Sequence, residues 1–287
     1  MKKFDLHIHD FLDDVTPEAF LSQLSDAGIY GAGVFSPPPP EAPFNGMPYE
    51  ERISRVLAFC KNYPGRLYPV LWMHAYEDGA VEKAIDAAGR GIAAFKIICN
   101  NYYVGDDKSL ELMHTIAKVK KPVIFHTGIL WDGTASAIYN RPINWECLIN
   151  VPGLKFATAH CSWPWYDECI ALYGKFQHAY SLNPDMSCEM FFDLTPGTPV
   201  PYRRDLLTKL FTVGYDVKHN IIFGTDCQTD YNAEWSLKWQ NIDNGLYHEI
   251  GVDDETVQRI YRDNFLRFLG VTNEVVAKAK LSIDGRK

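Results

Sequence analysis

The chain alternates short apolar runs with longer helical stretches from one end to the other. Short runs rich in β-branched and aromatic residues are typical of buried strands. They predict eight strands, at residues 4–9, 30–35, 67–74, 91–98, 123–126, 154–160, 188–194 and 220–226. Most of these runs are continuously apolar. We therefore expect a parallel sheet that is covered on both faces.

Local signals mark the segments between the strands. Thr16 has the residue type of an N-cap, Pro17 follows at the first helical position, and Gly28 ends the helix that they begin. Helices are predicted at residues 16–27, 49–63, 81–88, 110–119 and 254–269. The four prolines at 37–40 predict a loop.

Eight strands separated by helices predict an α/β fold of the (β/α)₈ TIM-barrel type. An open, doubly wound sheet is the alternative. It would be favoured by a glycine-rich phosphate loop after the first strand, but His7-Ile8-His9 stands there instead. No linker or low-complexity tract divides the chain, so we expect a single domain over residues 1–287.

Composition narrows the kinds of partner. The 287 residues carry a formal net charge of −8, which argues against a nucleic-acid partner because such proteins need a basic surface. No secretory signal or membrane-length apolar run is visible, so no membrane association is expected. The seven cysteines are scattered and never form a C-x-x-C motif. This pattern predicts reduced thiols in a cytoplasmic protein.

Candidate chemistry begins at the end of the first strand. Residues two apart in a strand point the same way, so His7 and His9 can face the barrel mouth together and bind one metal ion. Two surface histidines would give the same short motif by chance, and the pair alone is a weak signal.

The same kind of residue recurs at other strand ends. His126 ends the fifth predicted strand, His160 the sixth and Asp226 the eighth. Barrel enzymes build their active sites at these carboxyl ends. A hydrogen-bonded core histidine is the ordinary explanation for any one of them. Their repetition instead predicts a metal site.

These motifs resemble those of the amidohydrolase superfamily, in the amidohydrolase-related branch that includes aminocarboxymuconate-semialdehyde decarboxylase and dicarboxylate lactonases. The matching elements run in order along nearly the whole chain. They are Asp5-x-His7-x-His9, Lys96, His126-Thr127-Gly128, Ala159-His160-Cys161, Gly224-Thr225-Asp226 and the closing Ile260-Tyr261-Arg262-Asp263-Asn264-Phe265-Leu266. Two departures follow Lys96 and His160, where the branch often has His-Pro and glycines. We expect both to lie in substrate-facing loops.

The resemblance implies one divalent ion, zinc or alternatively manganese, held by His7, His9, His126 and Asp226. Asp226 would also take a proton from water, and His160 would orient water or polarise a substrate oxygen. In two-metal relatives the strand-four lysine is carbamylated and bridges the ions. We expect one metal and therefore place Lys96 on the substrate side, with a salt-bridged barrel lysine as the alternative.

Loop residues after strands four to six supply further candidates. Tyr102, Trp131 and Trp163 are predicted to line a pocket, and Arg141 to pair with a substrate carboxylate. Ordinary loop packing and surface salt bridges are the competing explanations. Arg203 and Arg204 are weaker candidates of the same kind, and a thiol nucleophile at Cys161 is a minor option.

The site predicts a hydrolase that uses a metal-activated water on an ester, lactone or amide of a small substrate, cyclic or carboxylated. A non-oxidative decarboxylase of an aromatic or unsaturated acid uses the same residues and stays open as the alternative. A non-catalytic metal-binding barrel is weaker, because no ligand is missing. A homodimer is common in the family and is expected by analogy.

Overall fold

The structure, a computed structural model, describes residues 1–11, 14–183, 185 and 188–271. Nine strands form one sheet in the order β8-β7-β6-β5-β4-β3-β2-β1-β9, and every neighbouring pair is parallel. The strands are β1 (Lys3–His9), β2 (Ile29–Phe35), β3 (Leu67–Met73), β4 (Ala94–Ile97), β5 (Val123–Phe125), β6 (Lys155–Thr158), β7 (Glu189–Asp193), β8 (Ile221–Ile222) and β9 (Cys227–Gln228).

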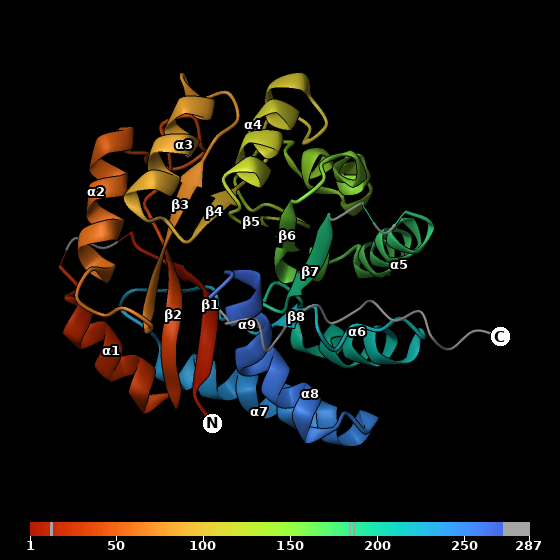
Figure 1. The fold of residues 1–287 in the computed structure, drawn as a ribbon. Coiled ribbons are helices and arrows are strands. Elements are labelled where there is room, and N and C mark those ends of the chain that lie inside the picture. Colours follow the sequence, from red (N-terminus) through yellow and green to blue (C-terminus); the bar gives the residue numbers. More distant parts are fainter. Residues whose placement is uncertain (12–13, 184, 186–187, 272–287) are drawn as a thin grey trace.

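Helices surround the ring of strands, except for the last one, which lies at its centre (Figure 1). They are α1 (Pro17–Asp26), α2 (Tyr49–Cys60), α3 (Ala80–Arg90), α4 (Asp107–Lys118), α5 (Tyr166–Leu182), α6 (Val200–Thr212), α7 (Ala233–Ile250), α8 (Asp254–Gln258) and α9 (Asn264–Phe268). Shorter 3₁₀ segments are η1 (Ala137–Asn140), η2 (Pro142–Asn150) and η3 (Ala159–Ser162), and η4 (Arg259–Asp263) is a π-helical turn. Among the described residues, no helix is both long and apolar enough to cross a membrane.

The eighth barrel strand is broken into two pieces. β8 pairs with β7, whereas β9 pairs with β1. The Leu6 N–H of β1 also donates to the carbonyl of Phe223, just after β8, at 3.0 Å. These bonds join the two ends of the sheet through one short stretch of chain. The fold is the TIM barrel that the strand–helix alternation predicts.

A β-bulge in β1 sets the direction of the first histidines. Asp5 pairs with Ala32 and Ile8 with Val34, so β1 uses one residue more than β2 over the same length. Such an extra residue re-aims the side chains that follow it. Leu6 packs in the inner core, yet His7 also faces inward, where its ring lies 4.6 Å from that of Phe35.

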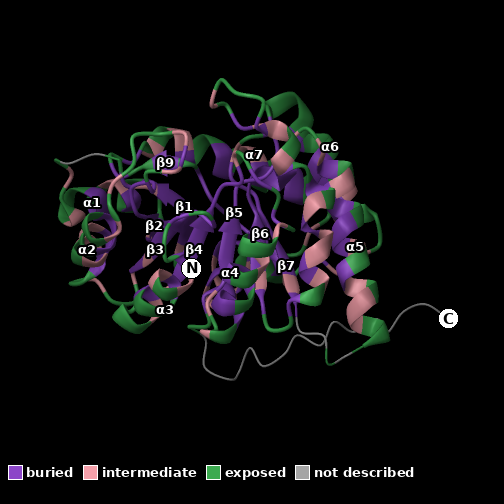
Figure 2. Ribbon diagram, turned by 90° about the horizontal axis from the view of Figure 1, so that it is seen from above, coloured by how far each residue is buried: buried purple, intermediate pink, exposed green. Residues whose placement is uncertain are grey.

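The inside of the barrel is filled by side chains, and the C-terminal helix closes one end of it. The inner core contains Phe4, Phe191, Phe265 and Phe268. Phe265 stacks on Phe4 with ring centroids 4.7 Å apart, and α9 lies at the centre of the ring of strands (Figure 1). The strands are buried, and the helices expose their outer faces (Figure 2).

The predicted strands occur in the predicted order, but several are shorter than predicted. The strand predicted at 91–98 is only Ala94–Ile97, because Gly91 still caps α3 in a left-handed conformation. The strand predicted at 154–160 ends at Thr158, because His160 has a φ of +61°. In the strand predicted at 220–226, β8 ends at Ile222, and Asp226 has a φ of +60°. Neither conformation fits an extended strand. The helix predicted at 254–269 is confirmed as the continuous run of α8, η4 and α9.

Candidate metal centre

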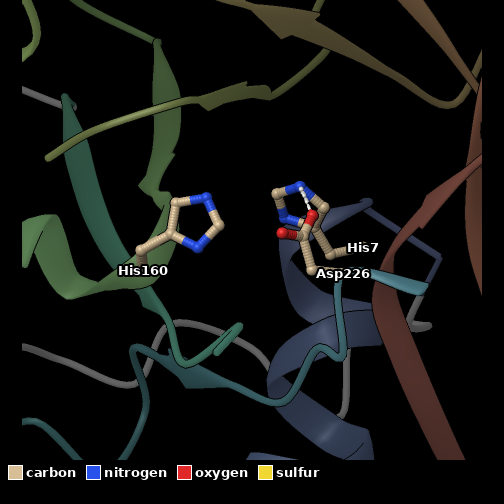
Figure 3. A group of neighbouring side chains, drawn as sticks. All are labelled: His7, His160 and Asp226. Atoms are coloured by element: carbon tan, nitrogen blue, oxygen red, sulfur yellow. Dashed lines mark ion pairs between the residues drawn. The ribbon is translucent and has the colours of Figure 1, made fainter. Parts of the chain in front are cut away.

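In the described part of the chain, His7, His160 and Asp226 form a group of potential metal ligands. One ligand atom from each lies within 4.8 Å of the others. Figure 3 shows the His160 ring facing the close pair of His7 and Asp226. The three residues come from β1, from η3 after β6, and from the break between β8 and β9. The carboxyl ends of distant strands therefore meet at one point, as they do in barrel active sites.

The other two predicted ligands lie beside this group. His9 Nε2 is 3.2 Å from Asp226 Oδ1, and His7 Nε2 is 3.3 Å from the same oxygen. His126 lies next to His160, on which its ring packs with the two ring centroids 4.9 Å apart. Its Nε2 is 3.3 Å from the Ile129 carbonyl oxygen. Two imidazoles and one carboxylate oxygen thus converge, with two more imidazoles next to them.

The backbone around His160 is left-handed over three residues. His160, Cys161 and Ser162 have φ values of +61°, +43° and +59°. Sparsely populated conformations of this kind persist only where the surroundings enforce them. Here the Ser162 hydroxyl donates to Thr127 Oγ1 at 2.9 Å, and the Thr127 hydroxyl donates to the Ala159 carbonyl at 2.5 Å. The turn is therefore tied directly to the residue after His126.

Asp193, at the end of β7, is a candidate site residue that the sequence interpretation missed. Its Oδ2 lies 2.7 Å from His7 Nδ1, and its Oδ1 accepts from both the N–H and the hydroxyl of Thr195. It follows two phenylalanines, so the rule that selected Asp226, a carboxylate ending an apolar run, would have found it. The Asp193 carboxylate therefore accepts three hydrogen bonds. The one from His7 Nδ1 fixes the orientation of the His7 ring.

Asp5 joins the two segments that carry His7 and Asp226. This fully buried carboxylate accepts from the N–H groups of His7 and Thr225, at 3.0 and 3.1 Å. It also accepts from the hydroxyls of Thr225 and Tyr231, at 2.6 and 3.0 Å. Burial raises the pKa of Asp5 to about 7, although these hydrogen bonds oppose the shift. Asp5 supports the bulge of β1 and the break before Asp226 together.

Comparisons with known proteins identify the family. The family model described as Amidohydrolase matches residues 14–271. The chain belongs to this family. Family members are generally metal-dependent hydrolases, as the resemblance implied. The matched segment begins after His7 and His9, and no curated protein sequence matches the chain.

Solved structures share the amidohydrolase barrel at low identity. One is described as a probable 2-pyrone-4,6-dicarboxylic acid hydrolase from Acinetobacter baumannii with citric acid bound. It has 14% identity and a TM-score of 0.63, and the alignment covers 94% of this chain and 100% of that one. Amidohydrolase 2 from Bifidobacterium longum subsp. infantis has 10% identity, coverage of 95% and 100%, and a TM-score of 0.57. Dihydroorotase from Campylobacter jejuni has 12% identity, coverage of 95% and 84%, and a TM-score of 0.58.

The protonation states in this amidohydrolase suit a bound cation. Burial holds the pKa of His7 well below its usual range, so its imidazole is neutral. Asp193 keeps the proton of that imidazole on Nδ1, which leaves a lone pair on Nε2. This lone pair faces the Asp226 carboxylate. Burial alone would raise the pKa of Asp226, but its contact with His9 and the neighbouring imidazoles keep it well below its usual range.

A lone pair facing a carboxylate oxygen is repulsive unless a cation lies between them. Imidazole nitrogen and carboxylate oxygen are the donors that zinc and similar divalent ions bind. In the described part of the chain, the buried Nδ1 atoms of His9 and His160 have no hydrogen-bond partner. Burial also lowers the pKa values of His126 and His160, so both favour the neutral form that binds metals. The donor set fits a divalent ion.

Lys96 lies against the same group. Its Nζ is 3.5 Å from His7 Nε2 and 5.3 Å from the centroid of the Phe35 ring. Burial lowers the pKa of Lys96 to about 8, and the charges of Asp226 and Asp193 oppose that shift. The structure therefore brings Lys96 beside the predicted ligands.

The loop residues predicted to bind substrate lie in different settings. Tyr102 is buried and packs edge-on against the ring of His74. Trp131 is 81% exposed. The guanidinium of Arg141 binds Glu168, the surface salt bridge that was its competing explanation. Trp163 is partly buried against the core. Their roles in binding substrate stay predictions.

Three weaker candidates have partners or environments that explain them. Arg203 is buried and bound to Asp243 through two hydrogen bonds, at 2.8 and 2.7 Å. Arg204 pairs with Glu249 at the surface. Cys161 is fully buried, and burial raises the pKa of its thiol well above the usual value. A buried thiol of this kind is a poor nucleophile, which argues against the thiol option.

Proposed function

We propose that the protein is a hydrolase that cleaves an ester, lactone or amide bond of a small substrate with the help of one divalent ion. His7, His9, His126 and Asp226 would hold the ion, zinc or alternatively manganese. The observation that carries the proposal is the convergence of His7 Nε2 and His9 Nε2 on Asp226 Oδ1, at 3.3 and 3.2 Å. The hydrogen bond between Asp193 and His7 supports it, because it leaves the lone pair of the His7 imidazole on Nε2, where a metal would bind.

A divalent ion in this position supplies Lewis acidity, which lowers the pKa of a coordinated water and polarises a carbonyl oxygen. The protein side chains provide the rest. Asp226 is ionised, so its carboxylate accepts the proton that the attacking water loses. His160 faces Asp226 and is placed to orient the substrate oxygen. Burial of His160 strengthens its electrostatic contact with the substrate.

Metal analysis tests the proposed ligand set. Purified protein should carry about one divalent ion per chain, as a mononuclear catalytic site does. Asp226→Asn should abolish turnover and leave the circular dichroism spectrum unchanged. Protein that carries no metal and binds neither added zinc nor manganese would contradict the proposal. Full activity of Asp226→Asn would remove Asp226 from the mechanism.

Decarboxylation is the second candidate, and Lys96 favours it. A buried ammonium 3.5 Å from His7 Nε2 could hold a substrate carboxylate at the ion. The two reactions leave different products. We expect lactones, esters and amides incubated in isotopically labelled water to give a labelled acid. Release of carbon dioxide from an aromatic or unsaturated acid, without incorporation of label, would favour the decarboxylase.

A further inference from the structure

A buried row of hydrogen-bonded side chains runs from helix α7 to Asp5, beneath the proposed metal site. Tyr231 Oη lies 3.0 Å from Asp5 Oδ2 and 2.8 Å from Ser236 Oγ. One turn further along α7, Gln240 Nε2 donates to Ser236 Oγ at 3.1 Å. All three side chains are buried, with at most 2% of each residue exposed. We call Gln240, Ser236 and Tyr231 the donor chain.

The amide of Gln240 can take only one orientation. Its Oε1 lies 2.7 Å from Lys3 Nζ, and its Nε2 lies 3.0 Å from the carbonyl oxygen of Ala27. An ammonium only donates and a carbonyl oxygen only accepts. A rotated amide would therefore lose both hydrogen bonds. The second N–H of the amide is left for Ser236 Oγ, which must act as the acceptor.

This orientation gives the whole donor chain one direction. A hydroxyl has one proton to donate, and either hydroxyl could donate across the contact between Tyr231 and Ser236. Asp5 accepts two hydrogen bonds on each oxygen, so the Tyr231 proton belongs to Asp5. Because Ser236 already accepts from Gln240, its own proton goes to Tyr231. Burial raises the pKa of the Tyr231 phenol well above its usual value, so the phenol keeps the proton that it donates.

The last hydrogen bond of the donor chain matters because of what Asp5 holds. Asp5 Oδ1 accepts from the N–H groups of His7 and Thr225, and Oδ2 accepts from the hydroxyls of Thr225 and Tyr231. Without the Tyr231 proton, Oδ2 keeps a single donor and the carboxylate is free to turn. The backbone segments that carry His7 and Asp226 would then shift with it. Hydrogen-bond partners outside the ligands tune metal affinity in this way.

We propose that Gln240 and Tyr231 are positioning residues of the metal centre, with the Gln240 amide setting the direction of the donor chain and Tyr231 delivering its last proton to Asp5. The inference rests on the proposed function, because it concerns the same metal site. Reversing the chain should harm metal binding as much as removing the Tyr231 hydroxyl does. Removing a link without changing the direction should not.

Three variants separate direction from packing. Tyr231→Phe removes the donor to Asp5. Gln240→Glu reverses the chain, because its carboxylate accepts from Ser236, and Ser236 in turn accepts from Tyr231. Both should raise the dissociation constant for zinc about tenfold in competition with a chromogenic chelator. Ser236→Ala leaves Tyr231 with Asp5 as its acceptor and should bind zinc as wild type does.

Tyr173→Phe is the matched control. Tyr173 is as buried as Tyr231, at 2% exposed, and its hydroxyl binds the Asp216 carbonyl and Asn220 Oδ1 at 2.6 and 3.1 Å. Its loss should lower the Tm of the metal-free protein as Tyr231→Phe does, but keep wild-type zinc affinity. The visible absorption of cobalt-loaded protein, which depends on ligand geometry, should change in Tyr231→Phe and not in Tyr173→Phe.

Wild-type zinc affinity in either Tyr231→Phe or Gln240→Glu would overturn the proposal. So would an equal loss of affinity in Ser236→Ala or Tyr173→Phe, because the donor chain would then act only through stability. If Gln240→Glu does not fold, the contrast between Tyr231→Phe and Ser236→Ala decides. Wild-type protein that binds no divalent ion would contradict the proposed function as well, whereas zinc binding that is alike in all variants contradicts this inference alone.

Discussion

Asp193→Asn is the substitution that best tests how the metal site is built. The native carboxylate accepts from His7 Nδ1 on one oxygen and from two Thr195 donors on the other. An asparagine amide has one acceptor end and one donor end. If its NH₂ faces Thr195, it meets a backbone N–H that needs an acceptor. If its NH₂ faces His7, it donates to Nδ1 and forces the imidazole proton onto Nε2, where the metal should bind.

The expected loss follows from that conflict. Removing a hydrogen-bond partner of a metal-binding histidine lowers metal affinity by about 10- to 100-fold. This corresponds to about 1.4–2.8 kcal/mol of binding free energy. The upper part of the range is expected here, because Asp193 is fully buried and its other oxygen cannot release Thr195 without leaving that N–H unpaired.

Competition with a chromogenic zinc chelator measures the affinity of each variant. Thermal unfolding of the metal-free forms separates a binding defect from a folding defect. Glu168→Gln is the control, because Glu168 is a carboxylate that binds Arg141 away from the predicted ligands. It should bind zinc as wild type does. If Asp193→Asn also binds zinc within a factor of about three of wild type, Asp193 does not set the tautomer of His7 and the reasoning fails.

Three further outcomes are expected. Arg203→Ala should lower the free energy of unfolding by about 3–5 kcal/mol in urea titrations, because it leaves a buried carboxylate unpaired. The neighbouring Arg204→Ala changes an exposed pair and should leave that free energy unaltered; equal losses would contradict this. Gly197→Ala should reduce kcat by about 10- to 100-fold, because its Cβ would lie 2.7 Å from the His160 ring, whereas Gly89→Ala meets no atom within 4 Å and should keep full activity. Chelation should lower the Tm by on the order of 10 °C if the ion is present at 1,000 times its Kd, and an unchanged calorimetric Tm would contradict a bound metal.

The order of the strands could be predicted because each apolar run is long enough to fill one barrel position. The polar residue after a run marks the end of the strand, so His126 and Asp226 were placed at the correct edge of the sheet. The same rule applied to the seventh run would have found Asp193. Its two preceding phenylalanines give the same signal as those runs.

Other features depend on contacts between distant residues. The bulge at β1 follows from its pairing with β2, where a Cβ on Gly33 would lie 2.8 Å from the Leu6 carbonyl oxygen. Nothing in the first apolar run itself indicates an extra residue. Trp72, whose ring centroid lies 5.7 Å from that of His9, could not be singled out for a similar reason. It stands inside a continuous apolar run, and only the barrel decides that its ring faces the site rather than the helices.

After His160 the chain has Cys161 and Ser162 where the family branch usually has glycines, and the structure gives these two residues another role than the sequence suggested. Cys161 and Ser162 were expected in a substrate-facing loop, but both side chains are fully buried. They stand where the branch usually has glycines and both adopt the left-handed backbone that glycine adopts freely. That conformation costs an ordinary residue about 1–2 kcal/mol. Part of this cost is offset by the Ser162 hydroxyl, which binds Thr127 at 2.9 Å and so ties the turn to the strand of His126. The change therefore alters how His160 is held beside His126.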